Sequence, residues 1–451
     1  MKLSKYTYEF KINNEITALY HALLVRVVFL KFNEIAALKE FLNGNTPKCD
    51  AEKETINYLF TNYFIVRDSK EDDLLYNKCI DLISHSAISN AYIVVTENCN
   101  FNCKYCFISK IVQKDAPSKT MTPEVAKKAV ALLQRTYERQ QSAYDKTITF
   151  YGGEPLLNIN VIQSFMEEVE KIKSSEQYWP HDVKYALISN GALISDEILN
   201  ILRKYGIALS ISYDIDKIAH SNRVSKNHED SFRIVREKIE LCKEWGYPFS
   251  LSITISEDTI QNREDVIKEI KQINPATVAF NMLIPNEHGI PPASYYERAT
   301  DFMIEAFKEL REVGIFEDRI MRKVQAFEDG KLFLYDCCAS GGNQYVIDPS
   351  GNIGICHGYL NNGKYFSDNV SNSNFDFRDN EVYRFWRNRT PLRMEQCKDC
   401  ECLGICGGGC PYAADFMHGS IYEVDDRFCI HAMKVLQWMI NDLYTQIVTK
   451  L

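Results

Sequence analysis

The stretch AYIVVTENCNFNCKYCF (residues 91–107) joins an apolar run to three closely spaced cysteines. Residues 91–96 are rich in apolar and β-branched side chains, as in a strand that is buried on both faces. Cys99, Cys103 and Cys106 follow in the loop after this strand. Three thiols cannot pair into disulfides without a remainder, and they are one short of the four ligands of a structural zinc. The stretch therefore predicts a sheet strand followed by a metal centre.

The chain beyond this stretch alternates between strand-like and helix-like segments. Apolar runs recur at 147–152, 184–189, 208–214, 250–256 and 277–285, with amphipathic segments between them. Two of these segments begin with Thr122-Pro123 and Ser195-Asp196, which are typical helix starts. Six β–α units predict an α/β fold with a parallel sheet, closed into an incomplete (β/α)6 barrel. In such barrels the chemistry lies at the carboxyl ends of the strands.

Four regions are expected along the chain. Residues 1–88 read as a small unit of three strands followed by three helices, and residues 89–315 form the barrel. Residues 316–335 form a bridge. Residues 336–451 are rich in Cys, Gly, Asn and Asp and contain a final amphipathic helix at 430–448. This last region has too little apolar core to fold unaided, so something other than hydrophobic burial should hold it.

Composition narrows the class of protein. Hydrophobic residues make up 45% and charged residues 25% of the 451 residues, as in a soluble globular chain. The net charge of -9 argues against a nucleic-acid partner. The longest apolar run is interrupted by Arg26 and is too short for a membrane span, and no apolar signal segment opens the chain. We therefore expect a cytoplasmic protein with no membrane partner.

The cysteines are clustered. Of the 15 cysteines, Cys49, Cys79 and Cys242 are scattered, and the others fall within 99–106 and 337–429. Clustered thiols in a reducing compartment indicate metal. For the first cluster, a zinc ion with a distant fourth ligand and coincidental buried cysteines are both alternatives. A [4Fe–4S] cluster with one open iron fits three cysteines best.

The spacing C-x3-C-x2-C after the first barrel strand, with Tyr105 before the third cysteine, resembles the radical S-adenosylmethionine (SAM) enzymes. The resemblance implies that the open iron binds SAM. Gly152, Gly153 and Glu154 resemble the family's motif for the SAM amino group, and Ser189 and Asn190 resemble its strand-three loop. Ser212 and Arg223 resemble the segment that contacts the SAM ribose and carboxylate, although Ile215 replaces the glycine expected after Asp214.

The tail resembles the SPASM extension of radical SAM enzymes, which carries two auxiliary [4Fe–4S] clusters. By that resemblance Cys338, Cys356 and Cys410 serve the first auxiliary cluster, with Cys337 as a fourth ligand or as a replacement for Cys338. Cys397, Cys400, Cys406 and Cys429 serve the second, which brings the total to three clusters. Cys402 is left as a bystander, a ligand or a catalytic thiol. Residues 348–356, DPSGNIGIC, predict a β-hairpin with Pro349 and Gly351 at its turn.

SPASM proteins act largely on peptides, and residues 1–88 resemble the leader-binding element of enzymes that modify ribosomally made precursor peptides. The resemblance implies crosslink formation in such a precursor, preferably a cysteine thioether, with an external donor such as flavodoxin or ferredoxin. The alternatives are carbon–carbon crosslinking, epimerisation, anaerobic sulfatase (formylglycine) maturation, or a non-enzymatic iron–sulfur electron carrier. His357 stands where sulfatase maturases usually have Asp, which disfavours that alternative. His357, Asp348 and Tyr359 are candidates for an acid or base, and a structural role is the simpler reading of each.

Overall fold

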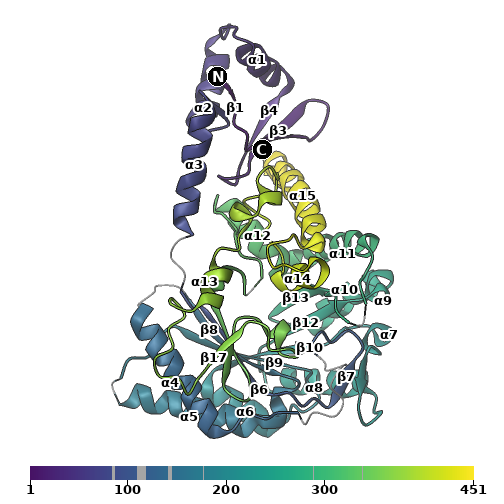
Figure 1. Ribbon diagram of the computed structural model, residues 1–451. Coiled ribbons are helices and arrows are strands. Elements are labelled where there is room, and N and C mark those ends of the chain that lie inside the picture. Colours follow the sequence, from purple (N-terminus) through teal and green to yellow (C-terminus); the bar gives the residue numbers. More distant parts are fainter. Residues whose placement is uncertain are drawn as a thin grey trace.

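The computed structural model describes residues 1–83, 87–108, 118–140, 145–175, 177–287, 289–337 and 339–450. Cys338 lies outside these residues. The chain forms an N-terminal unit, a central α/β barrel and a cysteine-rich tail that runs between the two (Figure 1). In the described residues, no helix is both long enough and apolar enough to cross a bilayer.

The N-terminal unit has the three strands and three helices that the sequence predicts. Its antiparallel sheet has the order β2-β3-β4, formed by Thr7–Lys11, Ile16–His21 and Arg26–Lys31. The helices are α1 (Phe32–Leu42), α2 (Asp50–Thr61) and α3 (Ser69–Leu82). A second small sheet, absent from the prediction, pairs β1 (Lys2–Leu3) with β5 (Ile65–Val66).

Strand β3 is buried on both faces, which fixes the unit on the rest of the chain. Leu19 packs in a separate small core that the unit's helices cover. Tyr20 points the other way and joins the main core, where its ring stacks on Phe327 with centroids 6.0 Å apart. Phe29 of β4 packs against Tyr444, 5.2 Å away between ring centroids. The unit is therefore docked on the tail and on the C-terminal helix (Figure 1).

The central sheet confirms the predicted parallel arrangement of six strands. Six parallel strands lie in the order β13-β12-β10-β9-β8-β6. They are β6 (Asn90–Thr96), β8 (Lys146–Gly152), β9 (Val183–Ser189), β10 (Ile207–Ser212), β12 (Phe249–Ile255) and β13 (Thr277–Met282). The short strand β14 (Phe316–Glu317) continues the sheet beyond β13.

Amphipathic helices cover the sheet. The longer ones are α4 (Pro123–Gln140), α5 (Ile159–Ser174), α6 (Asp196–Tyr205), α8 (Ser231–Glu244), α10 (Arg263–Ile273), α11 (Ala293–Glu312) and α12 (Asp318–Glu328). Shorter elements are β7 (Phe101–Cys103), η1 (Pro155–Asn158), α7 (Lys217–His220), β11 (Arg223–Ser225) and α9 (Glu257–Gln261). Ser195 caps α6 by accepting a hydrogen bond from the Ile198 amide, as its sequence indicates.

The tail extends the central sheet. β15 (Gln344–Ile347) pairs in parallel with β6, and β16 (Asn352–Gly354) and β17 (Phe366–Asn369) follow in antiparallel order. The predicted hairpin at 348–356 is thus confirmed, with Gly351 at a φ of +83°. The remaining elements are η2 (Ser340–Gly342), η3 (His357–Tyr359), α13 (Glu381–Arg387), η4 (Pro391–Arg393), η5 (Glu395–Cys397), α14 (Pro411–His418) and α15 (Asp426–Lys450).

The tail packs through an apolar core, contrary to the expectation that something other than hydrophobic burial holds it. Tyr345, Tyr383 and Trp386 are fully buried and belong to the same continuous core as the barrel strands. The Arg311 guanidinium on α11 forms two hydrogen bonds to the Asp442 carboxylate on α15, at 2.8 and 2.7 Å. The apolar side chains of the tail therefore pack in the same core as those of the barrel. This shared core could not be recognised in the sequence.

Candidate functional site

The cysteine loop leaves the carboxyl end of β6 and is pinned by a small sheet. β7 pairs with β11 in antiparallel register, which places Cys103 opposite Arg223. Burial, with added repulsion from the other thiols of the loop, raises the pKa of Cys99 to about 11 and of Cys103 to about 12. The thiols of Cys99, Cys103 and Cys106 therefore lie close enough for the charge on one to raise the pKa of another.

The three thiols of this loop match the donors of an iron–sulfur cluster. Closely spaced cysteines hold such clusters, and three of them leave one iron without a protein ligand. Buried thiols with raised pKa values are also costly as thiolates unless a cation offsets their charge. The donor set therefore fits a [4Fe–4S] cluster.

Gly152 and Gly153 let β8 approach the backbone of the cysteine loop. A Cβ atom on Gly153 would lie 2.3 Å from the Asn98 carbonyl oxygen, and one on Gly152 would lie 2.2 Å from that of Thr96. The Gly153 amide donates to the Thr96 carbonyl at 2.9 Å, and the Glu154 amide donates to the Asn98 carbonyl at 2.8 Å. The two glycines therefore set the position of the loop that carries the cysteines.

Glu154 is fully buried behind this loop. Its Oε1 accepts hydrogen bonds from the Ser189 hydroxyl at 2.8 Å and the Leu156 amide at 3.1 Å. Its Oε2 accepts one bond, from the Asn190 amide at 2.7 Å. Burial raises the pKa of Glu154 to about 7, and these hydrogen bonds oppose that shift. The carboxylate joins the ends of β8 and β9, and Oε2 retains acceptor capacity for a further donor.

Asn190 links strand β9 to the cysteine loop. Its Nδ2 donates to Asn100 Oδ1 at 2.7 Å and lies 3.8 Å from Cys99 Sγ. The side chains of Glu154, Ser189 and Asn190 are therefore grouped at the carboxyl ends of the strands, beside Cys99. This grouping matches the position predicted from the sequence. Contact of these residues with SAM stays a prediction.

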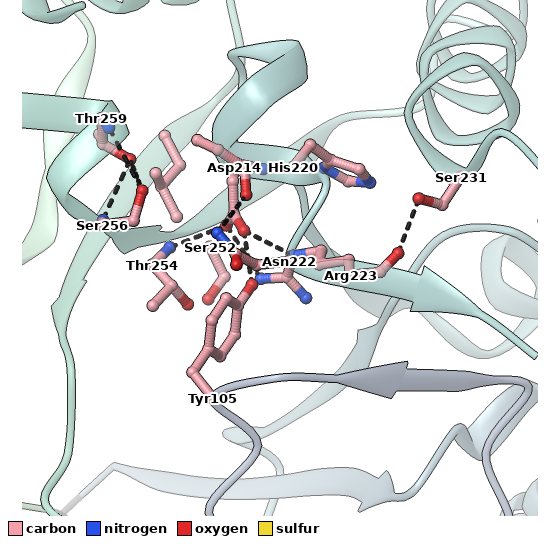
Figure 2. A network of polar contacts seen from close by, with 12 residues as sticks. Tyr105, Asp214, His220, Asn222, Arg223, Ser231, Ser252, Thr254, Ser256 and Thr259 are labelled. Atoms are coloured by element: carbon pink, nitrogen blue, oxygen red, sulfur yellow. Dashed lines mark hydrogen bonds and ion pairs between the residues drawn. The ribbon is translucent and has the colours of Figure 1, made fainter. Parts of the chain in front are cut away.

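Figure 2 shows a buried polar network around Asp214. The Tyr105 hydroxyl donates to Asp214 Oδ2 at 2.5 Å, and the Thr254 amide donates to Oδ1 at 3.0 Å. The Arg223 guanidinium donates to both carboxylate oxygens and lies 5.4 Å from the Tyr105 ring centroid. Asp214 thus holds Tyr105 and Arg223 beside the cysteine loop. It was quoted in the sequence motif but was not predicted as a site residue.

The two SAM contacts expected from this region differ in their surroundings. Ser212 ends β10 and is half-buried, with its backbone in register with Ser252 of β12. Arg223 is buried and uses two nitrogens on Asp214, so its first partner is a protein carboxylate. Ile215, in place of the expected glycine, still adopts a φ of +64° with its side chain buried. This left-handed conformation is strained for a β-branched residue.

In the tail, Cys337, Cys356 and Cys410 form a first thiol set. A hydrogen bond with Cys337 and burial raise the pKa of Cys410, and burial together with Cys337 and Cys410 raises that of Cys356. Of the doublet at 337 and 338, the structure thus groups Cys337 with these two thiols. Cys338 lies outside the described residues, so its predicted role as a ligand stays a prediction.

The four cysteines expected at the second auxiliary cluster, Cys397, Cys400, Cys406 and Cys429, form a second thiol set, and their binding of a cluster stays a prediction. Burial raises the pKa of Cys429 above its usual range, and the other three thiols of the set add to that shift. Cys402 is buried beside this set, where its thiol donates to Cys400 and lowers the Cys400 pKa to about 7. The Cys402 sulfur also lies 3.5 Å from that of Met433. A buried thiol held in this way is a poor candidate for a catalytic nucleophile.

The three acid or base candidates have different environments. The oxygens of Asp348 accept bonds from Ser350 and Asn352, so Asp348 shapes the hairpin turn. The Tyr359 hydroxyl donates to Asp415 at 2.9 Å. His357 packs among three rings, with centroids 5.0 Å from Tyr92, 5.2 Å from Tyr151 and 5.6 Å from Phe107.

His357 differs from Asp348 and Tyr359 in that one of its ring nitrogens, Nδ1, makes no hydrogen bond within the described residues. Burial lowers the pKa of His357 to about 4, so the ring is neutral near pH 7. In the described structure, its buried Nδ1 has no hydrogen-bond partner. His357 therefore keeps one polar atom available between the cysteine loop and the tail.

Comparison with known proteins agrees with this geometry. Residues 93–270 match the family model of the Radical SAM superfamily. The radical SAM cyclopropyl synthase TigE of Paramaledivibacter caminithermalis is 24% identical, over 95% of this chain and 93% of its own.

Two solved structures share the fold. Native anSMEcpe with bound AdoMet has a TM-score of 0.66 at 18% identity, covering 80% of this chain and all (100%) of its own. Streptococcus suis SuiB bound to its precursor peptide SuiA has a TM-score of 0.53 at 15% identity, covering 95% of this chain and 99% of its own.

Proposed function

We propose that this chain, whose residues 93–270 match the Radical SAM superfamily, is a peptide maturase that forms a new bond within a ribosomally made precursor peptide. The observation that carries the proposal is the convergence of Cys99, Cys103 and Cys106 beside Glu154 and Asn190, at the carboxyl ends of β6, β8 and β9. A reduced [4Fe–4S] cluster held there would cleave bound SAM to methionine and a 5′-deoxyadenosyl radical. The chain's own task is to orient SAM, present the peptide and exclude water.

Two groups of residues are proposed to hold SAM. Within the described part of the chain, Glu154 Oε2 accepts one hydrogen bond, from the Asn190 amide, which leaves it able to accept another from the SAM ammonium group. Tyr105 and Arg223 are fixed by Asp214 close to Cys103, so they would border the SAM site rather than move on binding. Ser212, at the end of β10, is proposed to contact the ribose.

The substrate is proposed to enter between the cysteine loop and the tail. Phe107 comes from the loop, Tyr92 and Tyr151 from β6 and β8, and His357 from the tail, and their rings pack around one another. His357 Nδ1 offers an unused polar atom within this aromatic surface. Such a surface suits an apolar peptide side chain that is held by one directed hydrogen bond.

The N-terminal unit is proposed to bind the leader of the precursor. In its sheet β2 and β4 are edge strands, and an extended peptide can add to such an edge through main-chain hydrogen bonds. Phe32 and Leu74 of this unit are 75% and 62% exposed and offer apolar contacts. The similarity to TigE extends over 95% of the chain, so it includes this unit as well as the barrel.

Two bond types are candidates. The likeness to a cyclopropyl synthase along nearly the whole chain favours carbon–carbon bond formation. A cysteine thioether, which the sequence favours, would use an open iron in the first auxiliary cluster, and such an iron requires that only one of Cys337 and Cys338 binds that cluster. In both cases the peptide loses two protons and two electrons in total: one hydrogen atom passes to the 5′-deoxyadenosyl radical, and one proton and one electron leave separately. The auxiliary clusters are proposed to pass the surplus electron to an external donor–acceptor protein such as flavodoxin or ferredoxin.

The test has two stages. After anaerobic reconstitution we expect about twelve irons per chain, from three four-iron clusters, and formation of 5′-deoxyadenosine from SAM. A chain that binds zinc instead, or that leaves SAM intact, would refute the proposal. The second stage incubates the enzyme with a precursor peptide encoded beside its gene and follows the peptide by mass spectrometry.

Mass alone does not separate the two bond types, because both remove two hydrogens. Alkylation with iodoacetamide does separate them, since a thioether consumes a cysteine thiol and a carbon–carbon bond leaves it reactive. Unchanged peptide in the presence of SAM cleavage would contradict the maturase proposal but not SAM chemistry.

A further inference from the structure

The segment Cys406-Gly407-Gly408-Gly409-Cys410 connects the two thiol sets of the tail. The side chain of Arg389 contacts the backbone carbonyls of this segment. All three glycines have positive φ angles, of +76°, +74° and +66°. The Arg389 Nη2 donates to the Gly408 carbonyl at 2.7 Å, and Nη1 lies 3.4 Å from the Gly409 carbonyl. The loop between the two sets therefore turns its carbonyls onto one guanidinium.

Arg389 is an unusual residue to bury. It follows α13, and its exposed fraction is 0%. Its other hydrogen bonds go to the Ile421 carbonyl and to the Ser340 hydroxyl. All four acceptors are neutral oxygens, and in the described part of the chain no carboxylate forms a salt bridge with it. A guanidinium does not lose its proton in a protein, so this position holds a full positive charge.

The carboxylate of Asp425 lies near Arg389 but forms its ion pair with Arg427. Asp425 forms two contacts with Arg427, at 2.8 Å from Nε and 2.6 Å from Nη2, and accepts the Cys410 amide at 2.9 Å. Asp425 and Arg427 thus neutralise each other. A buried charge without a counter-charge costs several kcal/mol or more, so an anion should lie close to Arg389.

Among the described residues, the groups that could place negative charge beside Arg389 are Asp425, which is paired with Arg427, and thiols of the two sets. Burial lowers the pKa of Arg389, and Cys337 and Cys410 of the first set, Asp425, and Cys406 of the second set oppose that shift. All-thiolate iron–sulfur clusters are anionic, and nearby charge is one determinant of their reduction potential. The guanidinium thus lies where it would be close to two anionic groups at once.

We propose that Arg389 is the shared counter-cation of the two auxiliary clusters, and that it raises the reduction potentials of both. The inference rests on the proposed function in one respect, namely that the tail thiol sets hold iron–sulfur clusters. Arg389 is a positioning residue, because it acts through the clusters and not on the peptide. Its charge favours acceptance of an electron by either cluster.

The first test measures potentials in the full chain with Cys99, Cys103 and Cys106 replaced by Ala, which leaves only the tail clusters. EPR-monitored redox titration compares this protein with its Arg389→Gln and Arg389→Lys forms. We expect Arg389→Gln to shift both midpoint potentials to more negative values and Arg389→Lys to restore most of the shift. Arg387→Gln is the matched control: it removes an arginine two residues away whose charged neighbours are Arg384 and Asp376 rather than cysteines.

The result would overturn the inference if neither potential moved, if only one moved, or if the Arg387 control moved both equally. A second measurement covers the case in which Arg389→Gln assembles poorly. Thermal unfolding is compared for the cluster-loaded and the chelator-stripped forms of each protein. Arg389→Gln should lower the midpoint of the loaded form more than that of the stripped form, in which the charge has no partner. Equal losses in both forms would mean a merely structural role.

These readouts need neither SAM nor peptide, so they fail independently of the proposed function. A wild-type tail that binds no iron would refute the counter-cation role, while SAM cleavage at the first cluster would still support radical chemistry. Conversely, shifted potentials in an enzyme that modifies no peptide would leave the role of Arg389 intact.

Discussion

Asp214 and Arg223 form a buried two-point ion pair, with Nε 3.0 Å from Oδ2 and Nη2 3.1 Å from Oδ1. Removing one partner leaves the other charge buried and unpaired, so Asp214→Asn should cost about 3–5 kcal/mol of unfolding free energy. Because Arg223 pairs with Cys103 across the small β7–β11 sheet, iron at the first site should fall as well. Urea unfolding and iron analysis measure the two effects. The double variant Asp214→Asn/Arg223→Gln should cost less than the two single changes added together, and strict additivity would contradict the pairing.

Gly153 is predicted to be intolerant of any side chain. In Gly153→Ala the new Cβ would meet the Asn98 carbonyl at 2.3 Å, which forces the cysteine loop to shift. We expect loss of about four irons per chain and of SAM cleavage, with the tail clusters retained. The control is Gly206→Ala, whose Cβ meets nothing within 4 Å and whose cost is about 1 kcal/mol of backbone strain. Full iron content in Gly153→Ala would show that the loop does not depend on this contact.

Cys337 and Cys402 are predicted to differ sharply in their effect on iron content. Cys337 lies with Cys356 and Cys410, so Cys337→Ala should lower the iron of the first auxiliary cluster. Cys402 is buried and interacts with Cys400, but it is not one of the four cysteines of the second thiol set, so Cys402→Ala should keep the full iron count. Iron and sulfide analysis after anaerobic reconstitution measures both variants. The reverse pattern would exchange their roles, and Cys338→Ala tests whether the neighbouring thiol replaces Cys337.

Glu317 is predicted to make stability depend on pH. It is fully buried at the start of α12, and burial raises its pKa from 4.5 to about 7. A raised pKa means that the folded state binds the proton more tightly. The contribution of protonated Glu317 to the unfolding free energy is therefore complete below about pH 4.5 and is lost as the pH rises through 7. Relative to Glu317→Gln, the wild-type unfolding free energy should fall by about 3 kcal/mol across this window. Urea curves at several pH values measure the difference, and parallel curves would contradict the shift.

Gly404 is predicted to couple the N-terminal unit to the tail. A Cβ at this position would lie 2.0 Å from the Ala22 carbonyl oxygen, so Gly404→Ala should displace the unit. SAM cleavage without peptide should continue, because the first cysteine site is unchanged. Modification of a leader-bearing precursor should fall roughly tenfold, which corresponds to a loss of about 1.4 kcal/mol of coupling between the unit and the tail. Gly363→Ala, in open space, is the control. Equal modification by both variants would mean that docking of the unit is not needed.

The barrel could be predicted from the sequence because its strands are continuous apolar runs. Residues 91–96, 147–152 and 184–189 coincide within one residue with β6, β8 and β9. Local patterning suffices there, since buried parallel strands need no long-range partner to be recognised. The cysteine spacings were equally informative, because chelation depends on short sequence distances.

What the sequence could not supply were the contacts made across long separations. Arg223 fits a contact with SAM as a motif, but its first partner is Asp214, and that choice depends on how β10 and β11 meet. Arg389 belongs to no recognisable sequence motif. Its place between the two thiol sets depends on contacts with the 406–410 loop, which only the folded chain forms. The pairing of β15 with β6 could not be predicted either, because a strand of four residues does not specify its neighbour.

The pairing of β15 with β6 has a consequence for how the chain is made. Strand β6 leaves the ribosome roughly 250 residues before the segment that covers its edge, so that edge stays open during most of synthesis. A chain that ends before residue 344 would keep it open permanently and present a template for aggregation. The last quarter of the polypeptide thus covers the open edge of the first barrel strand, and chimaeras that exchange tails between relatives must preserve this register to remain soluble.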